Sequence, residues 1–183
     1  MEFWLFMAGV ILLFFVLPYI RFFFKRLKCN IQITRVCCEK GYILHKNHAF
    51  WFLGSNNGKR CDCYVETGNE IFAIKLFGMT RKGKTLVFLE ERGYFIRRFM
   101  AMEIRLIYSF DGRVKEFPKY DFEYNNADSV TAKHIRKILL VNPVPREMRM
   151  QARNSKETIV SPGDVVYDLE IFNLSGLVNK LKE

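Results

Sequence analysis

The first twenty residues of the chain contain the feature that most limits how it can fold. From Phe3 to Ile20 there are 18 consecutive residues without a charged side chain. As an α-helix this run extends about 27 Å, close to the thickness of the hydrocarbon core of a bilayer. Trp4 and Tyr19 fall near its two ends, where amphipathic aromatic rings favour the headgroup region. The run therefore predicts a single transmembrane helix.

Two other interpretations of this run are a cleaved signal peptide and a helix buried in a protein core. A signal peptide has basic residues before the apolar run and small residues at a cleavage site after it. Here Glu2 is the only charged side chain before the run, and a basic, aromatic segment follows it. A core helix would have less unequal flanks. We therefore predict an anchor over residues 1–28, whose flanking cations are Arg21, Lys25, Arg26 and Lys28.

The distribution of charge predicts the orientation of this anchor. Its four cations follow the apolar run, and the positive-inside rule places that side in the cytoplasm. The N-terminus is then outside the cell membrane, and residues 29–183 form a cytoplasmic domain. The formal net charge of the chain is +10, and about +7 remains on this domain. A basic domain attracts anionic partners, of which lipid headgroups are the nearest, although the same charge also serves solubility alone.

The five cysteines indicate a reducing compartment. Their count is odd, and they include one adjacent pair and one Cys-x-Cys, which makes a poor disulfide framework. A zinc site is the sharper alternative, but structural zinc is usually held by two matching pairs of ligands with gaps of two to four residues. The spacing here does not supply them, so no metal site is predicted.

The rest of the sequence predicts one α+β domain. Half of the residues are apolar, so the chain can bury a core. Short strand-like segments alternate with turns rich in glycine and asparagine, which predicts a mostly antiparallel, mixed sheet with flanking helices. The expected strands are 42–44, 49–53, 61–66, 71–77, 85–89, 94–99 and 165–172, with 138–141 buried at the centre of the sheet and 147–157 as a polar connection.

Two helices are expected to flank this sheet. The first spans Ile31 to Lys40, after Asn30 as its cap, and Gly41 suits the left-handed residue beyond its end. The second closes the chain after a cap at Asn173 or Ser175. Both have an apolar stripe at helical spacing, which predicts that each packs one face against the sheet.

A hairpin centred on Gly68 and Asn69 brings together the residues with the most chemical interest. A two-residue loop at these positions places Asp62 opposite Lys75 and Tyr64 opposite Ala73. Side chains alternate along a strand, so these four lie on one face. The simplest interpretation of Asp62 and Lys75 is a cross-strand ion pair.

An acid that opens one strand and a lysine on the next strand resemble the restriction-endonuclease-like, or PD-(D/E)xK, nuclease superfamily. The resemblance rests on Asp62 and on Ala73-Ile74-Lys75, and it implies that Asp62 matches the first metal-binding acid and Lys75 the lysine that orients the attacking water. Ala73 departs from the pattern, because it occupies the position of the second acid. The resemblance therefore implies a degenerate member, which would use Mg²⁺ only if it retained activity.

Clusters of basic residues elsewhere predict contacts with anions. Lysine and arginine bind phosphates without reading sequence. The candidate anion-binding residues are Arg81, Lys82, Lys84, Lys133, Arg136 and Lys137. The function that we predict is a membrane-anchored, non-catalytic interaction domain that engages an anionic surface or a partner protein, without a cofactor. The alternative is a membrane-associated, degenerate nuclease-like protein that acts on nucleic acid.

Overall fold

The computed structural model describes residues 2–47, 59–78, 84–98, 114–122, 133–152 and 156–183. Within the first 22 residues, only Leu17 and Ile20 have described side chains. The described residues form two helices and two mixed sheets, which confirms the predicted α+β class. The strand predicted at 49–53 lies outside the described residues, as does the turn that holds Arg81 and Lys82.

The first sheet has six strands in the order β1-β2-β3-β7-β11-β10. Its strands are β1 (Ile43–Lys46), β2 (Cys63–Glu66), β3 (Glu70–Gly78), β7 (His134–Asn142), β10 (Val165–Val166) and β11 (Leu169–Phe172). The β2–β3 hairpin has the predicted register, with Tyr64 opposite Ala73. The buried run from Ile138 to Val141 lies in β7, near the centre of the sheet as predicted, and β7 is parallel to both of its neighbours.

A second sheet of five strands replaces the single sheet that the sequence suggested. Its order is β6-β5-β4-β8-β9, with β4 (Lys84–Leu89), β5 (Gly93–Arg98), β6 (Lys115–Glu116), β8 (Glu147–Gln151) and β9 (Thr158–Ile159). Strand β8 lies where we predicted a polar connection, so that prediction is wrong. The alternation of Met148 and Met150 with polar residues is the period-two signal of a half-buried strand.

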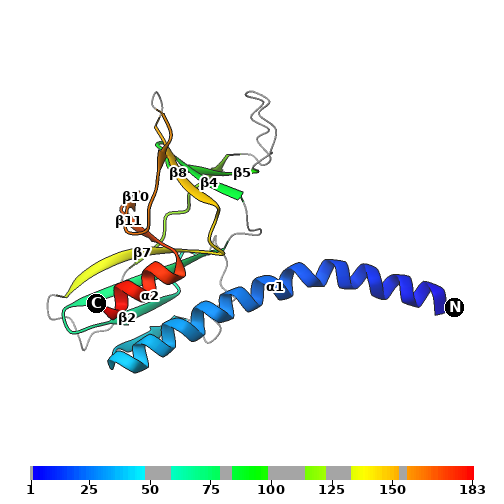
Figure 1. The fold of residues 1–183 in the computed structure, drawn as a ribbon, viewed down its shortest axis with the longest axis horizontal. Coiled ribbons are helices and arrows are strands. Elements are labelled where there is room, and N and C mark those ends of the chain that lie inside the picture. The colour runs from blue at the N-terminus through cyan, green and yellow to red at the C-terminus, as the bar shows by residue number, and fades with distance from the viewer. Residues whose placement is uncertain (1, 48–58, 79–83, 99–113, 123–132, 153–155) are drawn as a thin grey trace.

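The helices and the second sheet cover opposite faces of the first sheet, so the fold has three layers (Figure 1). The helices are α1 (Glu2–Lys40) and α2 (Leu174–Lys182). Because side chains alternate along β3, Phe72, Ile74 and Leu76 pack toward the helices, whereas Ala73 and Phe77 pack toward the second sheet. Burial on both faces explains why the central strands are almost continuously apolar.

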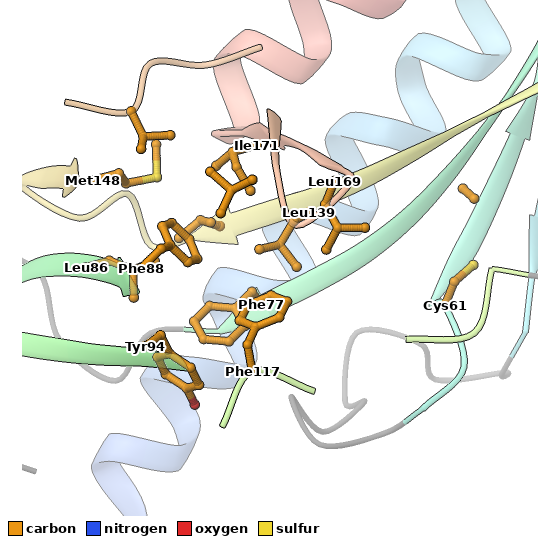
Figure 2. Packing of buried hydrophobic residues seen from close by; sticks show 14 of the residues in the cluster. Cys61, Phe77, Leu86, Phe88, Tyr94, Phe117, Leu139, Met148, Leu169 and Ile171 are labelled. Carbon is orange, nitrogen blue, oxygen red and sulfur yellow. The ribbon is translucent and has the colours of Figure 1, made fainter. Parts of the chain in front are cut away.

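Aromatic rings fill the space between the two sheets (Figure 2). Phe77 of β3 lies edge-to-face with Tyr94 of β5, with ring centroids 5.2 Å apart, and stacks on Phe117 at 6.0 Å. Phe88 of β4 contacts Phe117 at 5.9 Å. Such pairs contribute about 0.5–1.5 kcal/mol each beyond the area they bury. Phe117 therefore joins the strands of both sheets.

Helix α1 is longer than the sequence analysis predicted. It runs without a break from Glu2 to Lys40, through Pro18 and through Asn30, where we expected a new helix to begin. The predicted start of a separate helix after Asn30 is therefore wrong. The residues from Cys29 onward pack against the sheet as a continuation of the same helix. Ile33, Val36 and Cys37 are buried on that face, as predicted. Gly41 ends the helix with φ +68°, as expected for a left-handed residue beyond a helix.

The far end of α1 carries the predicted anchor. Among the residues that were described with side chains, no helix is long and apolar enough to cross a bilayer. Most side chains between Phe3 and Ile20 lie outside the described residues, so the transmembrane helix stays a prediction. The backbone of this stretch is helical and extends away from the two sheets (Figure 1).

Helix α2 closes the helical layer beside α1. Asn173 is its cap, one of the two residues predicted for this role, and its Oδ1 accepts a hydrogen bond of 2.7 Å from the Gly176 amide. Leu177 and Leu181 are buried on the face turned toward α1 and the sheet. The end of α2 also meets α1, because Lys40 Nζ donates to the Lys182 carbonyl at 2.5 Å.

Candidate functional site

Asp62 and Lys75 meet at the end of the β2–β3 hairpin, as the predicted register requires. Strand β2 begins at Cys63, so beyond that point the edge of β3 has no backbone partner from β2. Asp62 Oδ2 takes over this role and accepts a hydrogen bond of 2.7 Å from the Leu76 amide. Its Oδ1 lies 3.4 Å from Lys75 Nζ. The Asp62 carboxylate therefore accepts the hydrogen bond of a backbone amide at the edge of β3 and also pairs with the charge of Lys75.

Lys75 connects the hairpin to two neighbouring segments. Its Nζ donates to the Arg60 carbonyl at 2.8 Å and lies 5.3 Å from the centre of the Tyr120 ring. Arg60 in turn forms a backbone bridge with Asp121. The side chains of Lys75 and Asp62 are only 2% and 1% exposed. The pair thus faces the interior of the fold rather than an open cleft.

Arg26 of α1 enters the same buried region. The sequence analysis placed it among the cations that flank the anchor, but it is 1% exposed and lies close enough to Asp62 and Tyr120 for their charges to interact. Burial raises the pKa of Asp62, and the charges of Lys75 and Arg26 and the Leu76 amide oppose that change. Burial likewise lowers the pKa of Arg26, and Asp62 opposes it. The pattern of the sequence gave no sign that this arginine differs from its basic neighbours.

The residues around Asp62 do not match a divalent-metal site. Ala73, at the position of the second acid, is fully buried in the apolar layer between the sheets. The nearby acids bind elsewhere: Glu66 pairs with Lys133 at 2.8 Å and Glu70 with Arg136 at 3.4 Å. Within the described ranges, no three His, Cys, Asp or Glu side chains are grouped to hold a metal ion. A single carboxylate leaves most of a Mg²⁺ shell unfilled.

Two of the predicted anion-binding residues, Lys133 and Arg136, are paired with carboxylates in the described part of the chain. Lys133 bonds to Glu66 and to the Thr67 carbonyl, and Arg136 makes a bidentate pair with Glu170 at 2.7 and 2.5 Å. Both cations are therefore paired with carboxylates of the first sheet. Lys137 is exposed and Lys84 is half-buried. Arg81 and Lys82 lie outside the described residues.

The sequence analysis did not predict that the end of β7 and the turn after it lie beside the exposed stripe of α1. Leu17, Ile20 and Phe24 are spaced on one stripe of α1 and are 36%, 42% and 60% exposed. At the end of β7, Asn142 Nδ2 donates to the Lys25 carbonyl at 2.9 Å and lies 2.8 Å from Cys29 Sγ. Val144, two residues further, is exposed. The contacts of Asn142 place the start of this loop beside α1.

Comparison with known proteins does not assign the chain to a family. No protein-family model, curated protein or solved structure matches it. The resemblance to restriction-endonuclease-like nucleases therefore rests on the sequence pattern at Asp62, Ala73 and Lys75 alone.

Proposed function

We propose that the chain is a single-pass membrane protein, in which the first part of α1 crosses the bilayer and presents the remainder as a cytoplasmic, non-catalytic interaction domain. The observation that carries this proposal is the continuity of α1. One helix contains both the uncharged run from Phe3 to Ile20 and the segment from Cys29 to Cys37 that packs into the core. The anchor and the domain are thus parts of one element, without a flexible linker between them.

The exposed stripe of α1 supports a lipid environment. Leu17, Ile20 and Phe24 present large apolar side chains away from the rest of the chain. Contiguous exposed apolar surface on a soluble protein marks a contact with a membrane or a partner. This stripe begins within the uncharged run and ends four residues beyond it, and the basic residues Lys25 and Lys28 follow. Such an order fits the cytoplasmic boundary of a transmembrane helix.

The buried site supports an interaction role over catalysis. In a nuclease, Asp62 and Lys75 would have to reach a phosphodiester and a metal ion. In this fold their polar atoms are shielded and already bonded to Leu76, Arg60 and one another. We therefore assign this pair a structural role, in which it joins the hairpin to α1 and to the segment at Tyr120.

The natural cysteines provide a test of the anchor and its orientation. Cys38 is exposed on α1, whereas Cys29, Cys37, Cys61 and Cys63 are buried. The full chain would be expressed in cells, extracted with alkaline carbonate, and treated in intact cells with a membrane-impermeant maleimide. We expect the chain to stay in the membrane pellet. We also expect Cys38 to be labelled only after the membrane is permeabilised.

The matched control is Cys38→Ser, which should remove the label in permeabilised cells. Release of the chain into the carbonate supernatant would contradict the anchor. Labelling of Cys38 in intact cells would contradict the orientation but leave the anchor standing. Metal-dependent cleavage of nucleic acid that is lost in Lys75→Ala would contradict the non-catalytic assignment.

A further inference from the structure

We propose that the loop from Pro143 to Pro145, directly after Asn142 at the end of β7, is a second membrane contact, with Val144 inserted among the lipid headgroups beside α1. This inference rests on the proposed anchor and adds the face of the domain that meets the membrane. The partner is an anionic lipid surface.

The position of the loop along α1 places it at the correct depth. Asn142 bonds to the carbonyl of Lys25, which lies five residues beyond Ile20. Five helical residues extend about 7.5 Å along the axis. The headgroup region on one side of a bilayer is about 5–8 Å thick. If the hydrocarbon core ends near Ile20, Lys25 and the loop beside it lie at the outer edge of the headgroups.

The loop is built to expose one apolar side chain. Pro143 and Pro145 are buried, whereas Val144 between them is 46% exposed. Two buried prolines restrict the backbone on both sides of the valine, so little conformational entropy is lost when it contacts another surface. On α1, Phe24 precedes Lys25, the residue that Asn142 contacts, and is itself 60% exposed.

The charges near this surface suit anionic lipids. Lys28 is exposed one turn beyond Phe24, and the exposed Arg146 directly follows the loop. The amide of Arg146 donates to the carbonyl of Lys84, so the first residue of β4 also lies beside the loop. Basic residues close to an anionic bilayer strengthen binding to it. The combination of an apolar tip and neighbouring cations is typical of an interfacial membrane contact.

Fluorescence depth measurements on the full chain test this contact. An environment-sensitive dye would be attached at Val144→Cys in a Cys38→Ser background, and the protein reconstituted into vesicles that contain anionic lipid and a headgroup nitroxide quencher. The matched control carries the dye at Ile43→Cys. Ile43 is also exposed but follows the opposite end of α1, about 30 Å from Ile20 along the axis.

We expect blue-shifted, strongly quenched emission from position 144 and weak quenching from position 43, in vesicles where the chain resists alkaline extraction. Quenching at 144 should fall when neutral lipid replaces anionic lipid, and it should not depend on protein density.

Equal, weak quenching at both positions in an extraction-resistant chain would overturn the loop contact and leave the anchor intact. A blue shift at 144 that appears only at high protein density would assign the loop to a second copy of the chain. Loss of the chain from the vesicles would overturn the anchor itself.

Discussion

In one segment of α1 Leu17, Ile20 and Phe24 are exposed, whereas in the next segment Cys29, Ile33 and Cys37 are buried against β3, β7 and α2. The two segments belong to one helix, and each carries apolar side chains. What differs is the partner: the second segment meets the sheet, and the first extends beyond it (Figure 1). A helix with two such segments is suited to two environments, a protein core and a lipid bilayer.

The largest loss of stability is expected at Asp62, which interacts with Arg26 at the point where α1 reaches the core. Asp62→Ala removes the acid that faces Lys75 and Arg26, and it also leaves the Leu76 amide without its acceptor. Breaking a buried pair by removing one partner costs about 3–5 kcal/mol. We expect urea denaturation to show a loss of stability of this size. Glu39→Ala is the control, since its pair with Arg35 is on the surface and contributes little. Equal effects of the two substitutions would contradict the buried assignment of Asp62.

Two isoleucines on α1 compare the buried and exposed faces directly. Ile33→Ala leaves a cavity against the sheet and should cost about 2–5 kcal/mol. Ile31→Ala, two residues earlier, should change stability by less than about 0.5 kcal/mol, because that side chain is 58% exposed. Thermal and urea unfolding of both variants would give the two values. A large cost for Ile31→Ala would show that a further element covers this face of α1.

The adjacent residues Cys37 and Cys38 compare the buried and exposed faces of α1 through the reactivity of their thiols. Burial raises the pKa of the Cys37 thiol to about 11, whereas Cys38 is exposed. Mass spectrometry after alkylation at pH 8 should find Cys38 modified and the four buried thiols protected until the chain unfolds. Rapid modification of Cys37 in the folded chain would contradict its burial.

The buried thiols also predict how stability depends on pH. Burial raises the pKa of Cys29 and of Cys61 to about 12, from an ordinary value of 9.0. The folded state therefore keeps protons that the unfolded state releases, and stability falls as pH rises from about 9 toward 11, by roughly 1 kcal/mol per thiol per pH unit. Replacing Cys29 with alanine should make this decline shallower.

The smallest effect on folding is expected at the exposed stripe. Phe24→Ser removes an exposed ring that contacts only its neighbour Phe23 among the interactions described, at 5.7 Å between centroids. The free energy of unfolding of the Phe24→Ser variant should differ from that of the unchanged chain by less than about 0.5 kcal/mol. The same substitution should weaken the retention of the chain in vesicles, measured by flotation. Destabilisation as large as that of Ile33→Ala would contradict the contrast between the two segments.

Local patterns were sufficient to predict the hairpin, the buried strand at Ile138–Val141 and the left-handed Gly41, and they reduced the cap of α2 to Asn173 or Ser175. Each of these depends on residues close together in the sequence, such as the two-residue turn that sets the register of Asp62 and Lys75. The second sheet depends on the parallel pairing of β4 with β8, which are far apart in the sequence, and no local pattern reports it.

The candidate site was predictable only in part for the same reason. The register placed Asp62 beside Lys75, but the entry of Arg26 depends on how α1 crosses the sheet. The contact of Asn142 with Lys25 joins residues more than a hundred positions apart. Basic residues in a sequence also do not reveal whether a carboxylate lies nearby, so the pairs of Lys133 with Glu66 and of Arg136 with Glu170 could not be predicted.

The continuity of α1 is tested most directly by one distance between two spin labels. One label would be attached at Ile20→Cys and the other at the natural Cys38, both exposed. Eighteen helical residues span about 27 Å and return to the same face after five turns. For the full chain in lipid nanodiscs, we predict a narrow distribution of distances near that value. A broad distribution, or one centred far from it, would show a flexible joint between the anchor and the domain and would contradict the account.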